Sequence, residues 1–119
     1  MKIFNHPIDK SEVVKKYFSD PDKRITLKEG DVLLHQYAVN HRIFYIQEGK
    51  LIGMLPDKPH LEPIFEATTG SFAGVYSYCS EDHYSYSQVI ATHPTVVYYS
   101  EVEPEKLHEK ERTEYLALL

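Results

Sequence analysis

Seven histidines make metal binding the first chemistry to consider in this sequence. His35 and His41 are six positions apart, and Glu48 follows in a segment with turn character. Imidazole and carboxylate ligands must converge on one ion at about 2 Å, and this spacing does not force them together. We therefore expect structural or surface roles for His35 and His41, solvated loop positions for His83 and His93, and no metal site.

Residue patterns typical of catalysis are not found either. Cys79 lies beside Glu81 and Asp82, and nearby carboxylates raise the pKa of a thiol, which disfavours the reactive thiolate. The sequence has no Ser-His-Asp order, no paired carboxylates for acid–base work and no glycine-rich phosphate loop that would support catalysis. We predict no catalytic residues and no cofactor, so we do not expect an enzyme.

Tyrosine is unusually frequent, with ten copies and no tryptophan. Four tyrosines lie close together in the chain: Tyr76, Tyr78, Tyr84 and Tyr86. They either pack the core and plug a pocket, or they line a site for a planar ligand. Side chains alternate between the two faces of a strand. Ser85 and Ser87 should therefore face one side of their strand, and the tyrosines beside them the other.

The apolar periodicity predicts a β-rich middle with a helix at each end. Asp9 or Ser11 can cap a helix over about residues 9–19, whose apolar stripe should dock on the rest of the domain. Short β-patterns follow over about 24–101, and a second helix begins at about Pro104. This helix becomes apolar only near the end of the sequence, so we expect a continuation of the chain or a partner to cover it.

About eight short strands without intervening helices indicate a sandwich, a jelly roll or a barrel. In 47–50, Gln-Glu-Gly-Lys, glycine stands third between two apolar runs, which predicts a β-hairpin. Residues 84–91 and 95–100 are predicted to form the last pair of strands, joined across 92–94.

Composition excludes several classes of protein. The formal net charge of −5 argues against DNA or RNA binding through this segment, because phosphate contacts need basic clusters. No stretch approaches the roughly 20 continuous apolar residues of a membrane span, and we expect no membrane partner. The single cysteine fits a reducing compartment, so we expect a cytoplasmic protein.

Three segments, taken in order, resemble the cyclic-nucleotide-binding domain. Residues 26–34 are similar to its first hairpin, and 43–51 look like the hairpin in which an apolar strand ends at a turn glycine. Residues 70–74, Gly-Ser-Phe-Ala-Gly, with the β-runs at 89–91 and 95–98, resemble its phosphate-binding cassette and the strands that follow. The resemblance covers nearly the whole chain. It implies a mainly β fold, a double-stranded β-helix (jelly roll) of about eight strands with short N-terminal and C-terminal helices.

The resemblance also implies that the nucleotide site is degenerate. In the family, the cassette helix directs free backbone N–H groups at the cyclic phosphate. A glutamate accepts from the ribose, and an arginine about ten residues later holds the phosphate. Gly74 matches the cassette glycine, but the glutamate position falls on Val75 and the arginine position on about Ser85. No arginine lies between Arg42 and Arg112, so we do not expect conventional cyclic AMP or cyclic GMP binding.

Any ligand is expected in the cassette and the segment that returns beside it. The candidate pocket residues are Phe72, Ala73, Gly74, Val75, Ser85, Tyr86 and Ser87. The alignment implies that Ser85 and Ser87 point inward beside Gly74. The signal is expected to be a shift of the trailing helix from Pro104 onward.

The function implied by the resemblance is regulatory. Diverged relatives in transcription regulators of the catabolite activator and fumarate–nitrate regulator type keep the β-roll without the nucleotide-binding pair. We therefore expect residues 1–119 to be a single effector-sensing domain, the N-terminal part of a longer transcription regulator. Its partners would be an unknown small-molecule effector, a second copy in a homodimer, and DNA through a C-terminal domain beyond these residues.

Two other functions stay open. The first is a ligand-free interaction or dimerisation domain of a signalling protein, with a plugged pocket. The second is a metal-dependent cupin-like enzyme, which uses a similar roll. The cupin pattern needs two histidines one residue apart, and this sequence lacks that pair.

Overall fold

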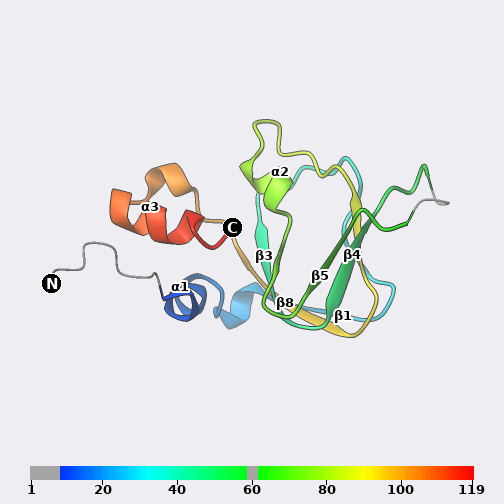
Figure 1. The fold of residues 1–119 in the computed structure, drawn as a ribbon, viewed down its shortest axis with the longest axis horizontal. Coiled ribbons are helices and arrows are strands. Elements are labelled where there is room, and N and C mark those ends of the chain that lie inside the picture. Colours follow the sequence, from blue (N-terminus) through cyan, green and yellow to red (C-terminus); the bar gives the residue numbers. More distant parts are fainter. Residues whose placement is uncertain (1–8, 59–61) are drawn as a thin grey trace, which may run out of the picture.

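The computed structural model describes residues 9–58 and 62–119, and within them the fold is mainly β (Figure 1). One antiparallel sheet, sheet A, has the strand order β1 (Arg24–Leu27), β8 (Thr95–Ser100), β3 (Ile43–Glu48) and β6 (Phe72–Ala73). The other, sheet B, has the order β2 (Val32–Leu34), β7 (Gln88–Ala91), β4 (Lys50–Met54) and β5 (Phe65–Thr68). The helical elements are α1 (Lys10–Tyr17), η1 (Pro21–Lys23), α2 (Val75–Cys79), η2 (Pro104–Lys106) and α3 (Glu109–Leu116). The predicted jelly-roll class is confirmed.

The inner faces of the two sheets form the first hydrophobic core. Phe44, Ile46 and Val97 project from sheet A, and Leu51 and Val89 project from sheet B to meet them. All five side chains are buried. Residues two apart in a strand share a face, so the alternation in β3 and β8 leaves a second set of side chains on the outer face of sheet A.

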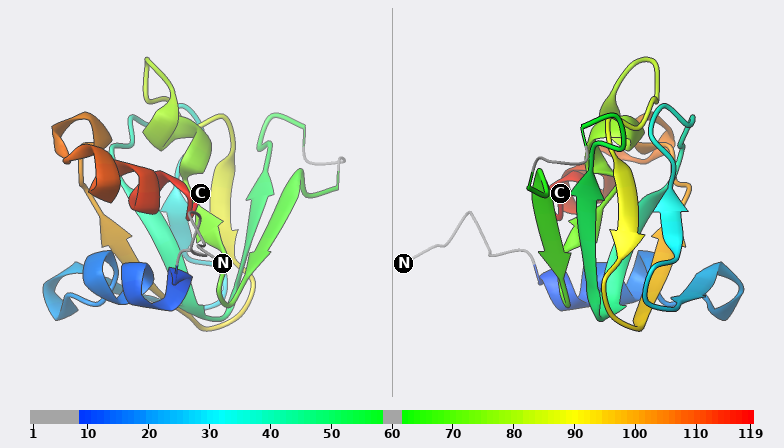
Figure 2. Two further views of the ribbon diagram at one scale, coloured as in Figure 1. Left: turned by 60° about the vertical axis from the view of Figure 1, so that its left-hand side comes forward. Right: turned by 90° about the vertical axis from the view of Figure 1, so that its right-hand side faces the viewer.

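A second hydrophobic core lies on that outer face and is covered by the terminal helices. Figures 1 and 2 show α1 and α3 on the same side of the roll. Val13 and Phe18 from the α1 segment, with Tyr115 and Leu118 from the α3 segment, pack there with Ile43 of β3. The N-terminal helix forms as predicted, because the Asp9 carboxylate accepts from the N–H of Ser11 and caps it.

The hairpin predicted around Gly49 is wrong. The strands β3 and β4 follow each other in the chain but lie in different sheets, and the same holds for β7 and β8. Instead, the turn between β3 and β4 is hydrogen-bonded to the turn between β7 and β8. The N–H of Lys50 donates to Thr95 Oγ1 (3.1 Å), and the N–H of Thr92 donates to the carbonyl of Lys50 (3.1 Å). Each turn therefore takes the chain from one sheet to the other. In this arrangement Ile46 of β3 and Leu51 of β4 face the same core from opposite sheets.

Gly49 is closely surrounded at this corner, so we expect its replacement by alanine to destabilise the protein. Its φ is +113°, and a Cβ there would overlap Thr95 Oγ1 and lie 2.7 Å from the carbonyl of Pro94. Gly30 has a φ of +90° but open space around it. We expect Gly30→Ala to lower the free energy of unfolding by about 1–2 kcal/mol, the cost of the backbone conformation. Gly49→Ala should cost roughly 2 kcal/mol more, because overlap is added. Urea denaturation measures both, and equal losses would refute the packing argument.

The C-terminal helix begins later than predicted. Residues from Pro104 form the short η2, Leu107 is extended, and α3 starts at Glu109. The Arg112 side chain explains the break, since its Nε donates to the carbonyl of Pro104 (3.0 Å) and its Nη2 to that of Leu107 (2.9 Å). Leu107 packs into the second core at this bend.

The apolar end of this helix was expected to be covered by a continuation of the chain or by a partner. For two of its residues this expectation is wrong. Tyr115 and Leu118 are 0% and 8% exposed, and they pack against the α1 segment of the same domain. Leu116 points elsewhere and is 42% exposed.

Candidate functional site

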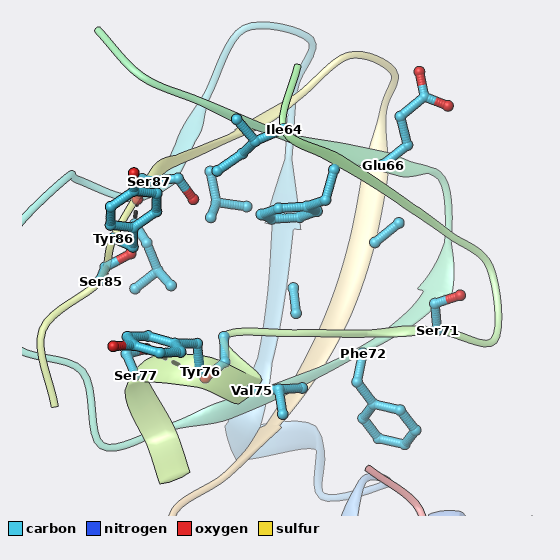
Figure 3. Close-up of a pocket in the computed structure, with 16 residues that line it drawn as sticks. Ile64, Glu66, Ser71, Phe72, Val75, Tyr76, Ser77, Ser85, Tyr86 and Ser87 are labelled. Atoms are coloured by element: carbon cyan, nitrogen blue, oxygen red, sulfur yellow. Dashed lines mark hydrogen bonds between the residues drawn. The ribbon is translucent and has the colours of Figure 1, made fainter. Parts of the chain in front are cut away.

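A cavity of about 650 Å³ opens between α2, β5, β6 and the segment that leads into β7 (Figure 3). The seven predicted pocket residues all line it: Phe72, Ala73, Gly74, Val75, Ser85, Tyr86 and Ser87. They come from two stretches far apart in the chain, which the jelly-roll topology brings together. Their part in ligand binding stays a prediction.

Phe72 contributes its backbone rather than its ring. In Figure 3 its side chain points away from the cavity. The ring packs against that of Phe18, with 5.3 Å between centroids, and so belongs to the second core. Phe72 therefore fastens β6 to the helical side of the domain.

Gly74 and Asn40 determine where α2 begins. Gly74 is the N-cap of α2 with a φ of +80°, and a Cβ there would lie 3.1 Å from the carbonyl of Arg42 and 3.1 Å from Asn40 Nδ2. The buried Asn40 amide donates to the carbonyl of Arg42 (2.7 Å) and to Ser77 Oγ (2.9 Å). Sequence reasoning missed Asn40, because an asparagine before a strand carries no signal of its distant partner.

The predicted alternation of serines and tyrosines is correct, although residues 84–87 precede β7 rather than belong to it. Ser85 and Ser87 are 4% and 5% exposed, whereas Tyr84 and Tyr86 are 50% and 59% exposed. Backbone bonds to a neighbouring loop position this segment: the N–H of Tyr37 donates to the carbonyl of Ser85 (2.7 Å). The Ser85 hydroxyl donates to the carbonyl of Ser87 (2.7 Å).

The four clustered tyrosines take three different positions. Tyr78 is buried in the second core, while Tyr76 and Tyr86 are exposed at the cavity. Tyr84 is exposed and does not line the cavity. Both predicted roles, core packing and pocket lining, are thus present but divided among different residues.

The cavity carries little charge. Among the described residues that line it, Glu66 is the only one with a charged side chain, and Lys50 Nζ lies 3.4 Å from its Oε1. Val75 and Ser85, which the resemblance places at the family's glutamate and arginine positions, both line the cavity. The described wall thus offers an anion no side-chain cation.

Most of the remaining lining is apolar and was not assigned to a site from the sequence. Leu34 of β2, Phe65 and Ala67 of β5 and Val89 of β7 line the cavity together with Ile64. Their β-patterns were visible in the sequence. Which of these residues face a shared space depends on strand pairing, which the local pattern does not contain.

A buried hydrogen-bond network connects α2 to α3. Tyr78 Oη donates to the carbonyl of Val102 and lies 3.0 Å from Tyr115 Oη. Tyr115 Oη in turn lies 3.0 Å from Ser100 Oγ of β8. Burial and the neighbouring Tyr115 hydroxyl raise the pKa of Tyr78, and burial raises the pKa of Tyr115. Both phenols are therefore neutral donors at ordinary pH.

The other residues considered for chemistry lie outside this cavity. Within residues 9–58 and 62–119, no three His, Cys, Asp or Glu side chains come together in a metal-binding arrangement. The rings of His41 and His83 pack with centroids 4.2 Å apart, and His83 Nδ1 is buried without a partner among the described residues. His83, predicted to be a solvated loop residue, is therefore only half-exposed. Burial raises the pKa of the Cys79 thiol; the direction was predicted, but the cause is not the neighbouring carboxylates.

The fold and the cassette-like cavity define a class: the chain has the fold of a cyclic-nucleotide-binding domain. No protein-family model matches the chain, and no curated protein sequence matches it. Among the described residues, no helix is both long and apolar enough to cross a bilayer.

Solved structures carry the comparison. A cyclic nucleotide-binding domain from Methylobacillus flagellatus aligns with a TM-score of 0.73 at 16% identity, covering 99% of this chain and 67% of that one. The catabolite activator protein of Thermus thermophilus aligns at 0.64 and 14% identity, covering 97% of this chain and 47% of that one. A transcriptional regulator from Thermotoga maritima aligns at 0.62 and 13% identity, covering 90% and 75%. At these identities the likeness establishes the fold alone.

Proposed function

We propose that this chain is a regulatory domain, not an enzyme, that senses a small molecule in the cavity beside α2 and transmits its presence to α3. The network from Tyr78 through Tyr115 to Ser100 carries the proposal, because it joins the helix at the cavity to the helix that covers sheet A. Transmission requires an element whose arrangement the ligand can bias. The Tyr78 contact supplies such a link.

The wider setting of the domain is part of the same proposal. Two similar structures belong to a catabolite activator protein and a transcriptional regulator, which supports a role in transcription control with DNA bound by another domain. We propose a cytoplasmic homodimer with a degenerate nucleotide site. The substitution of Val75 and Ser85 for the family's charged pair supports the last point.

A melting-temperature screen tests sensing. A ligand at 100 times its Kd adds about 2.7 kcal/mol of stability, which shifts the melting temperature by several degrees. We expect no rise with millimolar cyclic AMP or cyclic GMP and a rise with another small metabolite. That metabolite should also slow amide hydrogen exchange in α3, because the network passes on its effect.

Two tyrosine variants separate transmission from binding. Tyr78→Phe should keep the rise in melting temperature but lose the slowed exchange in α3, because the hydroxyl link is gone. Tyr98→Phe is the matched control, since Tyr98 packs in the same second core without belonging to the network. An equal loss in both variants would contradict the proposed path.

A second candidate, a ligand-free dimerisation domain, is favoured by one surface. Tyr37, Val39 and Tyr84 are 64%, 58% and 50% exposed, and Val39 forms a backbone bridge with Tyr84. Exposed apolar groups gathered in this way are typical of protein interfaces. If no compound raises the melting temperature and the protein sediments as a dimer, this candidate replaces the first.

A further inference from the structure

We infer that the cavity beside α2 takes a flat, uncharged, largely apolar ring compound, held at the mouth by Tyr76 and Tyr86. This inference rests on the proposed sensing function and names the class of ligand. It differs from a cyclic nucleotide in the two properties that the cavity selects, charge and polarity.

The wall of the cavity is largely apolar. Leu34, Phe65, Ala67, Val75 and Val89 all line the cavity. A volume of about 650 Å³ lies within the range of pockets that enclose a drug-sized molecule. Apolar ring atoms placed there would leave water and contact aliphatic and aromatic carbon. A sugar phosphate would lose its hydration and gain no side-chain cation, only the backbone N–H groups at the start of α2.

Two serine hydroxyls of the inner wall, those of Ser85 and Ser77, already donate hydrogen bonds within the protein. The Ser85 hydroxyl donates to the carbonyl of Ser87 (2.7 Å). Ser77 Oγ donates to the carbonyl of Gly74 (3.2 Å) and accepts from the Asn40 amide (2.9 Å). A ligand that needs hydrogen-bond donors from these two hydroxyls would have to break these bonds. A ligand with few hydrogen-bonding groups need not.

The charge of the cavity wall also disfavours an anionic ligand. Glu66 is the only residue with a charged side chain among the described lining residues, and its carboxylate points away from the cavity in Figure 3. Lys50 lies 3.4 Å from Glu66 Oε1 and offsets that charge at the rim without lining the cavity itself. An anionic ligand would find no side-chain cation in the described wall, so neutral compounds are favoured.

Two exposed aromatic rings, those of Tyr76 and Tyr86, lie at the cavity. Tyr76 is 70% exposed and Tyr86 is 59% exposed, although both line the cavity. Figure 3 shows their rings on the same side of the cavity, Tyr76 from the first turn of α2 and Tyr86 from the segment before β7. Aromatic faces prefer to stack on flat rings, and the phenol hydroxyls can meet a polar edge in water.

A pair of fluorescent probes tests the ligand class. N-phenylnaphthylamine is neutral and aromatic, and anilinonaphthalene sulfonate has the same ring skeleton with an added anionic group. We expect the neutral probe to bind the wild-type protein at least about tenfold more tightly than the sulfonate, because the skeleton is the same and only the charge differs. Fluorescence titration of the whole chain measures both.

Three variants locate the bound probe. Tyr76→Ala and Tyr86→Ala should each weaken binding of the neutral probe about fivefold through lost stacking. Tyr84→Ala is the matched control, because Tyr84 is nearly as exposed as Tyr86 but does not line the cavity. Gly53→Ala should weaken binding strongly, because a Cβ there would overlap the ring of Phe65, and displacing that ring reshapes the cavity that it lines.

The outcomes separate this inference from the proposed function. Equal binding of both probes, equal losses in Tyr84→Ala and Tyr86→Ala, or full binding to Gly53→Ala would overturn the inference. If cyclic AMP raises the melting temperature of the wild type but not of Gly53→Ala, the ligand class is wrong and the sensing function stands. If neither the neutral probe nor any metabolite binds, both fail together.

Discussion

Replacing Tyr115 with alanine should lower the free energy of unfolding by about 3–5 kcal/mol, the range for deleting a large buried aromatic side chain. Tyr115 is fully buried in the second core. Its ring meets that of Tyr17 edge to face, with 4.8 Å between centroids, and also packs near Phe18. The substitution would therefore separate α3 from both α1 and sheet A. Urea denaturation followed by circular dichroism measures the loss.

Two comparisons make the Tyr115 result specific. Tyr115→Phe keeps the ring and removes only the hydroxyl, so it should cost about 1–3 kcal/mol, because Ser100 and Tyr78 lose a buried partner. Leu116→Ala, at the exposed neighbouring residue, should cost less than about 1 kcal/mol. If Tyr115→Ala costs no more than Leu116→Ala, the second core does not hold α3 in solution.

Restoring the charged pair should restore cyclic nucleotide binding. We expect the double variant Val75→Glu with Ser85→Arg to bind cyclic AMP about 100-fold more tightly than the wild type. A bidentate arginine–phosphate pair in a partly enclosed site is worth several kcal/mol. Both positions line the same cavity. Isothermal titration calorimetry measures the affinity.

The cost and the control for this variant follow from the burial of Ser85. Its side chain is 4% exposed, so an arginine without a ligand should lower the melting temperature, and cyclic AMP should recover it. Ser85→Met with Val75→Glu places a long, flexible side chain without a charge at the same position and should gain nothing. An unchanged affinity in the arginine variant would show that Val75 and Ser85 do not occupy the family's two positions.

Much of the candidate site was predictable because it depends on short-range patterns. The resemblance of the Gly-Ser-Phe-Ala-Gly segment to the family's cassette identifies Gly74 as the cassette glycine. Alternation predicts that Ser85 and Ser87 share one face, the resemblance implies that this face points inward, and both residues are buried. The helix cap at Asp9 is equally local. In each case the determining atoms lie within a few residues of one another.

The sequence by itself therefore determined the mainly β class and the order of its main elements, about eight strands between two helical ends. The helix α2 was expected only from the family resemblance, and the loss of the charged pair at Val75 and Ser85 stays a prediction. Only the tertiary structure decided which strands pair, since the turn at Gly49 has the same local signal whether it closes a hairpin or crosses between sheets. It also decided the division of the tyrosines, with Tyr78 buried and Tyr76 at the cavity. The physical reason is common to both: pairing and burial depend on partners distant in the chain, such as Thr95 for Lys50 and Tyr115 for Tyr78.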